Sequence, residues 1–269
     1  MKTVLVTGAY GGMGKATVRL LTERGYHVYA LDKRVEAAEE NVTPIEADVT
    51  DEASVAAAFE RVKSTCEHLD AILHFAGIYL LDSLVEMSDE SFRRMLDVNL
   101  RGAFLINKHF LPLLQKDSRI LITTSELAPL DPLPFTGLYA VTKAALDKYA
   151  YSLRMELQLL GITVSVLRAG AVETDMLGVS TAHLTRFCEN TALYSCNAAR
   201  FRRIVDGVEA KRVSPVKIAE KCVRILKKRR PRFAYAINRN PLLLLLNCLP
   251  KRTQLWVIRM VLRSKKEKA

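Results

Sequence analysis

Tyr139 and Lys143 are the residues whose types and spacing first point to chemistry. They stand four positions apart, so on a helix both side chains lie on one face, roughly 6 Å from each other. A phenol has an unperturbed pKa of about 10, and a neighbouring ammonium group favours its phenolate form, which suits acid/base catalysis near neutral pH. The same spacing also fits a half-buried tyrosine beside a solvated lysine on an ordinary helix. The pair therefore needs support from elsewhere in the chain.

A glycine-rich segment near the N-terminus supplies part of that support. Residues 2–7 form a short apolar, β-branched run, residues 8–14 contain four glycines, and a helical pattern follows until Gly25. Strand, glycine turn and helix is the order that phosphate binding requires, because a bare backbone approaches a pyrophosphate closely and the helix start offers free N–H groups. An ordinary tight turn needs fewer glycines. The segment predicts a dinucleotide site that includes Thr7, Gly8, Tyr10, Gly12, Met13 and Gly14.

Asp32 indicates which dinucleotide binds. It ends the second predicted strand, residues 27–31, and stands 24 residues after Gly8. A carboxylate at this place accepts hydrogen bonds from the adenosine ribose and repels a 2′-phosphate, which favours NAD over NADP. Lys33 and Arg34 follow at once and could offset that repulsion, so NADP is not excluded. The third predicted strand, 43–47, leads to Asp48 and Val49, which we expect beside the adenine.

The remaining pattern alternates strands with helices. Further strands are expected at 70–74, 119–124, 162–167 and 233–237, with a long helix over 88–114 and another from Tyr139 to Gly161. Such alternation implies right-handed β-α-β units. We therefore predict an α/β fold with a single doubly wound, Rossmann-type domain and about seven parallel strands between helices on both faces. Residues 1–240 would form this domain, with 175–213 as a substrate loop and 241–269 as a C-terminal extension.

Together these residues resemble the short-chain dehydrogenase/reductase family over roughly residues 2–240, and its steroid- and retinol-type members in particular. The family's glycine pattern T-G-x-x-x-G-x-G matches residues 7–14. Ser125 lies 14 residues before Tyr139, about one residue more than is usual in the family, and a proline-rich loop at 128–137 can absorb the difference. The family's catalytic tetrad is matched in order by Asn99, Ser125, Tyr139 and Lys143.

The resemblance implies roles for these residues. Tyr139 would be the general acid/base, and Ser125 would hold and polarise the substrate oxygen. Lys143 would lower the pKa of Tyr139 and bind the nicotinamide ribose, and Asn99 would keep a water-linked proton path to Lys143. The cofactor supplies the hydride chemistry, and no metal is expected. Further cofactor contacts are implied for Ala76, Gly77, Gly170, Val172 and Thr174.

Two departures from the family pattern affect the cofactor side. The family's usual N-N-A-G is replaced by His74-Phe75-Ala76-Gly77, and its P-G by Ala169-Gly170. Either change can alter cofactor affinity, but neither removes a catalytic group. A single histidine at a strand end is more often structural than catalytic, so we interpret His74 as structural. The predicted activity is hydride transfer between NAD(H) and a secondary alcohol or ketone; the alternative is an NAD(P)-binding sensor or scaffold without appreciable catalysis.

The substrate loop and the C-terminal extension are apolar. In 175–213 this favours a lipophilic steroid-, retinoid- or lipid-like substrate, although the same side chains could simply pack on the core. The extension combines two apolar segments, 241–250 and 255–262, with Lys251, Arg252 and later lysines. Neither segment reaches the roughly 20 residues that span a bilayer, but peripheral contact with an anionic membrane would suit this composition. Alternatively, the extension packs against a second subunit, in a homodimer or homotetramer, or covers the substrate entrance.

Charge and cysteine content indicate which partners, metal sites and cellular compartment to expect. Residues 1–199 carry 19 Lys and Arg against 25 Asp and Glu, a net −6, whereas 200–269 carry 21 against 4, a net +17. No nucleic-acid recognition motif accompanies this basic region, so we expect no nucleic-acid partner. The five cysteines are scattered and lack C-x-x-C spacing, which favours a reducing compartment and predicts neither disulfides nor a zinc site. Without a signal-peptide pattern at residue 1, a cytoplasmic location is expected.

Overall fold

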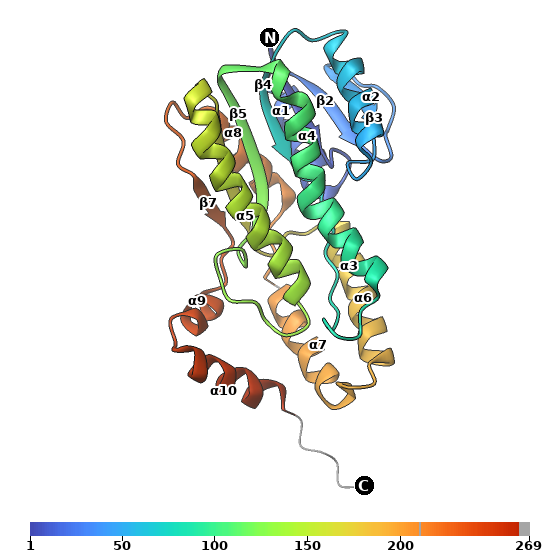
Figure 1. Ribbon diagram of the computed structural model, residues 1–269, viewed down its shortest axis with the longest axis vertical. Coiled ribbons are helices and arrows are strands. Elements are labelled where there is room, and N and C mark those ends of the chain that lie inside the picture. The colour runs from blue at the N-terminus through green and yellow to red at the C-terminus, as the bar shows by residue number, and fades with distance from the viewer. Residues whose placement is uncertain (210, 264–269) are drawn as a thin grey trace.

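The computed structural model describes residues 1–209 and 211–263, which are organised around one parallel β-sheet (Figure 1). The strands are ordered β3-β2-β1-β4-β5-β6-β7, and every neighbouring pair is parallel. The strand order reverses between β1 and β4, and ligands of such sheets bind outside the carboxyl ends of the strands at this point. The predicted doubly wound sheet is confirmed. Its strands are β1 Lys2–Thr7, β2 Tyr26–Asp32, β3 Val42–Glu46, β4 Leu69–His74, β5 Leu114–Ser125, β6 Thr163–Ala169 and β7 Ala234–Ile237.

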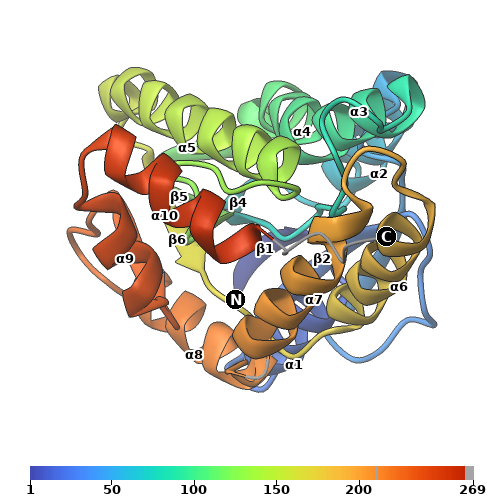
Figure 2. The ribbon, with the colours of Figure 1, turned by 90° about the horizontal axis from the view of Figure 1, so that it is seen from below.

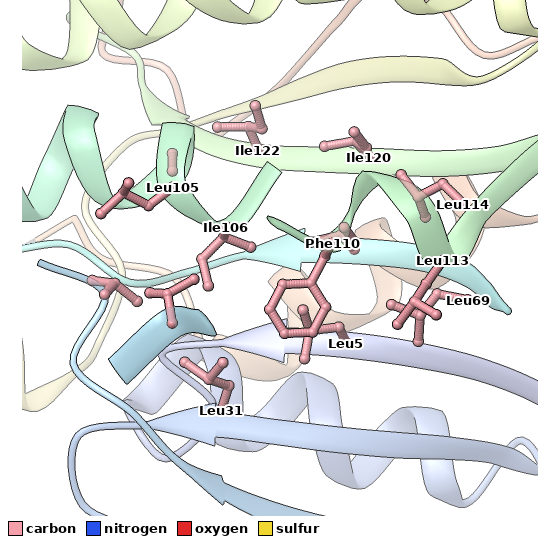
Figure 3. Close-up of a cluster of buried hydrophobic side chains, with 14 of the residues drawn as sticks. Leu5, Leu31, Leu69, Leu105, Ile106, Phe110, Leu113, Leu114, Ile120 and Ile122 are labelled. Carbon is pink, nitrogen blue, oxygen red and sulfur yellow. The ribbon is translucent and has the colours of Figure 1, made fainter. Parts of the chain in front are cut away.

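Helices cover both faces of the sheet. One face packs on α2 Glu52–Lys63, α4 Gly102–Phe110 and α5 Gly137–Leu157, and the other on α1 Gly12–Thr22 and α8 Pro215–Leu226. Because both faces are covered, the strands are apolar almost without interruption. Figure 3 shows part of the first core, where the buried Phe110 of α4 lies among Leu5 and Leu69 of the sheet.

The expected helix over 88–114 is interrupted. It begins as α3 Asp89–Leu96 after Ser88, whose hydroxyl accepts a hydrogen bond from the Ser91 N–H. A π-helical turn, Asp97–Arg101, separates α3 from α4, and a 3-10 turn, Leu111–Leu113, precedes β5. The prediction of a single regular helix was wrong because the chain has one wide turn that the apolar spacing does not reveal. Such turns often occur at functional sites, and this one holds Asn99 inside, with 1% of its surface exposed.

The predicted substrate loop is largely helical. It forms α6 Asp175–Asn190 and α7 Ser195–Glu209 beyond the carboxyl ends of the strands (Figure 1). Their apolar residues form a third core with two loops, so part of the apolar character of this region serves packing. Phe201 and Val205 also face the cavity described below. The third core consists of Leu81, Phe135, Leu184, Phe187, Ala198, Phe201 and Val205.

The C-terminal extension forms α9 Pro241–Asn247 and α10 Lys251–Leu262, and α10 runs across the carboxyl side of the sheet toward α7 (Figure 2). At its start, Lys251 pairs with Asp131, and the Asp131 N–H donates to the Asn247 side chain over 2.7 Å. At its end, Asn197 donates to the Leu262 carbonyl over 2.7 Å. Among the described residues, no helix is both long and apolar enough to cross a membrane.

Candidate active site

The glycine turn after β1 is shaped by contacts that exclude side chains. Gly8 has φ +66, and a Cβ there would lie 2.5 Å from the Ala76 nitrogen at the end of β4. A Cβ on Gly14 would lie 2.0 Å from the Gly8 carbonyl oxygen, so the first turn of α1 packs directly on the loop. Gly11, which caps α1, offers no side-chain acceptor, and the first turn holds no acidic residue. The N–H groups at the start of α1 therefore suit an anion.

Gly12 brings the start of α1 against a distant segment. A Cβ on Gly12 would lie 2.6 Å from Cγ2 of Thr174, the residue that caps α6. Met13 and Val172 line the same apolar cavity as Thr174. The sequence predicted all four as cofactor contacts, and the structure brings them together across about 160 residues of chain.

A long cleft of about 870 Å³ follows the carboxyl ends of β1, β2 and β4. Thr7 lies beneath it, fully buried. Its lining contains seven of the predicted cofactor residues and adds Arg34, Arg93 and Arg94 at the rim. The predicted members are Gly8, Tyr10, Asp32, Asp48, Val49, Ala76 and Gly77.

Asp32 is held in place by backbone donors. The Tyr10 N–H donates to its Oδ2 over 3.0 Å, and the Lys33 N–H donates to its Oδ1 over 2.8 Å. The Lys33 ammonium turns away and pairs with Asp48 over 2.7 Å. The hydrogen bond from Lys33 holds the pKa of the Asp48 carboxyl down to about 2. Of the two cations that follow Asp32, Lys33 is thus engaged elsewhere.

Tyr139 lies in the first turn of α5 and lines a second, apolar cavity of about 180 Å³ together with Ser125 at the end of β5. Burial raises the pKa of the Tyr139 phenol to about 12, while its hydrogen bond with Ser125 acts in the opposite direction. The Tyr79 ring packs edge-on against Tyr139, with ring centroids 4.5 Å apart. The phenol therefore carries its proton at neutral pH.

Lys143 lies one helical turn below Tyr139, as the spacing predicts. Its Nζ is 5.8 Å from the centre of the Tyr139 ring and donates to the Thr123 carbonyl over 3.2 Å. Burial lowers the pKa of the Lys143 ammonium to about 8. The raised pKa of Tyr139 follows from burial of the phenol and the charge of Glu126, and the expectation that Lys143 lowers this pKa stays a prediction.

Asn99 connects the π-helical turn to the loop after β4. Its side chain accepts from the Ile78 N–H over 2.7 Å and donates to the Ile78 carbonyl over 2.9 Å and to the Thr142 hydroxyl over 3.1 Å. A Cβ on Gly77 would lie 3.2 Å from Asn99 Oδ1 and 3.4 Å from Lys143 Nζ. Asn99 thus fixes the loop that lies over Lys143. The structure brings all four predicted catalytic residues to one end of the sheet.

His74 is structural, as the sequence indicated. It is buried, shares a 3.0 Å hydrogen bond with the Asn107 side chain, and loses its charge because burial lowers its pKa to about 4. Gly170 accommodates a second close approach: a Cβ there would lie 1.9 Å from the Asn238 carbonyl oxygen.

Four residues of the site carried no predicted role. Tyr79 packs on the Tyr139 phenol, Thr142 holds Asn99, and Leu243 of α9 lines the cavity. Glu126, next to Ser125, also lines the cavity and is only 8% exposed. Only Thr142 and Glu126 had a signal in the sequence: Thr142 shares a helix face with Tyr139, and Glu126 is a charge at the end of an apolar strand.

Comparison with known proteins agrees with this geometry. Residues 2–184 match the family model of the short chain dehydrogenases. The chain belongs to the short-chain dehydrogenase/reductase family. It is 32% identical over 220 residues to the oxidoreductase UcpA of Escherichia coli, an alignment that covers 77% of this chain and 84% of UcpA. It is 33% identical over 191 residues to mouse estradiol 17-beta-dehydrogenase 2, covering 66% of this chain and 50% of that one.

A solved structure shows the same architecture. The alcohol dehydrogenase of the archaeon Thermococcus sibiricus, complexed with 5-hydroxy-NADP, is 25% identical and superposes with a TM-score of 0.73 over 90% of this chain and 99% of its own. A short-chain dehydrogenase/reductase acts on CH–OH groups with a nicotinamide cofactor. Three features of the site suit such a cofactor: the glycine turn at Gly8, Gly12 and Gly14, the anchored Asp32, and the Tyr139–Lys143 pair. The protein is therefore an NAD(P)-dependent oxidoreductase.

Proposed function

We propose that this oxidoreductase interconverts a lipophilic secondary alcohol and its ketone with NAD(H). The observation that carries the proposal is that two differently built sites adjoin at the start of α1, where Gly11 lines the cleft and Met13 lines the apolar cavity. The Tyr139 phenol faces an apolar cavity, while the Asp32 carboxylate is anchored in the cleft that begins at the glycine turn.

The chain's own residues account for the proton and for orientation. In the reducing direction, Ser125 holds the substrate oxygen, and Tyr139, protonated because its pKa is raised to about 12, donates a proton to that oxygen as it gains negative charge. In the oxidising direction Tyr139 must accept the proton, so the rate is expected to rise with pH. Lys143, held at the Thr123 carbonyl, would bind the nicotinamide ribose. The nicotinamide ring, when bound, supplies or accepts the hydride.

Tyr139→Phe tests this mechanism. The variant keeps the ring that packs on Tyr79 but lacks the proton donor, so turnover should fall by about 10²–10⁴-fold while NADH affinity changes little. The measurements are steady-state oxidation of a panel of secondary alcohols and NADH fluorescence titration. Undiminished turnover in the variant would contradict this mechanism. NADH binding by the wild type without turnover of any alcohol or ketone would favour a cofactor-binding sensor.

The preference for NAD is supported by the engagement of Lys33. Because Lys33 pairs with Asp48, it is not directed at Asp32, and the carboxylate is left to repel a 2′-phosphate. Arg34 at the rim of the cleft remains a cation within the site. We expect kcat/KM to favour NAD over NADP, and Asp32→Ser to lower this ratio by about tenfold or more, which is the scale of one charged hydrogen-bonding contact. A ratio that is unchanged by the substitution would contradict the assignment.

The lipophilic substrate class is supported by the lining of the cavity. Around Ser125 and Tyr139 the cavity is walled mainly by apolar side chains, and one relative of this chain is named for estradiol. The apolar wall is Met13, Leu127, Leu133, Val172, Phe201, Ile204, Val205 and Leu243.

A peripheral membrane contact through the extension is part of the proposal. Leu255 and Trp256 of α10 are 69% and 62% exposed, and residues 221–263 contain no Asp or Glu against twelve Lys and Arg. Exposed apolar side chains beside unbalanced positive charge suit an anionic lipid surface. The double variant Leu255→Gln, Trp256→Gln should co-sediment less with phosphatidylserine vesicles, whereas Leu159→Gln, 83% exposed elsewhere, should not. Equal sedimentation of the three proteins would reject the contact.

Self-association is proposed through α4 and α5. An apolar groove of about 400 Å³ lies between α4 and α5 and is lined in part by Phe104. Phe104 and two residues of α5, Val141 and Met155, are each nearly half exposed. A two-fold pairing would place the same surface of two copies together. Light scattering should report a dimer or tetramer for the wild type and a smaller species for Phe104→Arg.

A further inference from the structure

Glu126 places a carboxylate in the wall of the apolar cavity. It follows Ser125 directly, and its own N–H donates to the Ala169 carbonyl over 2.9 Å, which continues the pairing of β5 with β6. Consecutive Cα atoms are about 3.8 Å apart. Glu126 lines the same cavity as Ser125 and Tyr139, and its charge acts on the Tyr139 phenol, whose pKa it helps to raise.

The two oxygens of this carboxylate have different surroundings. Oε2 accepts a hydrogen bond of 2.6 Å from the Asn240 N–H, just before α9. Oε1 lies against the Gly170 backbone, 3.0 Å from where a Cβ on that glycine would stand. No residue in the described part of the chain donates a hydrogen bond to Oε1. Anchoring the extension through Asn240 uses one oxygen and leaves the other to the cavity.

A carboxylate in such a place is costly unless a ligand uses it. Burial raises the pKa of Glu126, and the Asn240 N–H and the charge of Arg239 act only partly against this. When a ligand that fills the cavity displaces water from Oε1, that oxygen loses free energy unless the ligand supplies a matching donor. Sites built to hydrogen-bond a substrate group therefore reject analogues that lack the group far more strongly than apolar pockets reject a change of size.

We propose that Glu126 is a specificity-determining residue whose carboxylate accepts a hydrogen bond from a second donor on the substrate, a hydroxyl or an ammonium group within a few bonds of the reacting carbon. The preferred substrate is then a lipophilic alcohol or ketone that carries a neighbouring hydroxyl or amino group. This inference rests on the proposed function, since it assigns the substrate class of the same cavity.

Three alcohols with the same carbon chain test the inference: 2-octanol, 1,2-octanediol and 1-amino-2-octanol. In each, oxidation at C2 passes hydride to NAD⁺ and one proton to Tyr139, giving ketone and NADH. The wild type should favour at least one donor-bearing alcohol over 2-octanol by about tenfold or more in kcat/KM. Preference for the amine alone identifies an ammonium partner, and preference for the diol identifies a hydroxyl.

Variants separate recognition from folding. Glu126→Gln keeps an oxygen that can accept from Asn240 but removes the charge, so the amine-to-octanol ratio should fall by about tenfold, and the diol-to-octanol ratio should fall less. Asp131→Asn is the matched control, because it disturbs the anchor of α10 without lining the cavity; it should keep both ratios. If the glutamine variant does not fold, Glu126→Asp, which retracts the carboxylate, should lower the same ratios.

A binding measurement distinguishes failure of the inference from failure of the proposed function. With saturating NADH, 1-amino-2-octanol or 1,2-octanediol should raise the melting temperature of the wild type more than 2-octanol does, and this difference should shrink in Glu126→Gln. Selective binding without turnover would retain the inference and refute the function. Turnover or binding with no preference for either donor-bearing alcohol, or with identical ratios in the wild type and Glu126→Gln, would overturn the inference.

Discussion

The cleft and the apolar cavity both lie at the carboxyl edge of the sheet, but they are built in different ways. Backbone shapes the cleft: Gly8 approaches the end of β4, and main-chain N–H groups hold Asp32. Side chains shape the cavity, and they come from segments as distant as Met13, Phe201 and Leu243. A backbone-shaped site recognises the part of a cofactor common to a whole family, whereas a wall of side chains is free to vary with the substrate.

The largest expected effect comes from adding one methyl group to the cleft. In Gly8→Ala the new Cβ would lie 2.5 Å from a main-chain nitrogen, at φ +66. Strain and overpacking together should lower the free energy of unfolding by about 4 kcal/mol and abolish NADH binding. Gly25→Ala is the control, because Gly25 has φ +77 but no atom within 4 Å of the added Cβ; it should cost about 1 kcal/mol and leave NADH binding intact. Urea unfolding and NADH titration of both variants measure the difference, and equal costs would show that the close approach is unimportant.

An effect of intermediate size is expected from His74, which lies buried at the end of β4. Its pKa is lowered from 6.5 to about 4, so between these values the unfolded chain binds the extra proton. The contribution of the neutral His74 to the free energy of unfolding is therefore fully present above pH 6.5. It falls by about 3 kcal/mol as the pH falls toward 4. Urea unfolding at pH 7 and 4.5 should show a smaller loss in His74→Gln than in the wild type.

The exposed His68 provides the comparison for this experiment. His68→Gln should reproduce the pH dependence of the wild type. A wild type and a His74→Gln variant with the same acid sensitivity would mean that the buried imidazole is not what destabilises the protein in acid.

The smallest expected effect concerns the cavity wall. Leu243→Ala should lower kcat/KM for a lipophilic alcohol about fivefold, which corresponds to about 1 kcal/mol of lost apolar contact, without changing NADH affinity. Leu245→Ala on the same helix is the control, since Leu245 is 64% exposed and does not line the cavity. A similar loss in both variants would place the effect in α9 as a whole instead of in the cavity wall.

The sequence predicted most of what is local. The strand–glycine–helix order placed Gly8 and Asp32, and the four-residue spacing placed Tyr139 above Lys143, because each depends on a few consecutive residues. The π-helical turn at Asn99 was missed, since one extra residue per turn leaves no mark in apolar spacing. The substrate side was not predictable: Leu243 lies 104 residues after Tyr139, and only the packing of α9 and α10 brings it to the cavity. The raised pKa of Tyr139 likewise depends on tertiary burial, which spacing does not report.

The attachment of α10 has a mechanical consequence. At the C-terminal end of the helix, Asn197 and Arg200 of α7 hold the carbonyl groups of Leu262 and Val261. A force applied at the C-terminus is therefore borne first by these few side-chain hydrogen bonds, one after another, and not by the parallel strands. Pulling from that end should detach α10 at low force and leave the sheet intact. The force trace should therefore show two separate unfolding events, first that of the C-terminal extension and then that of the domain.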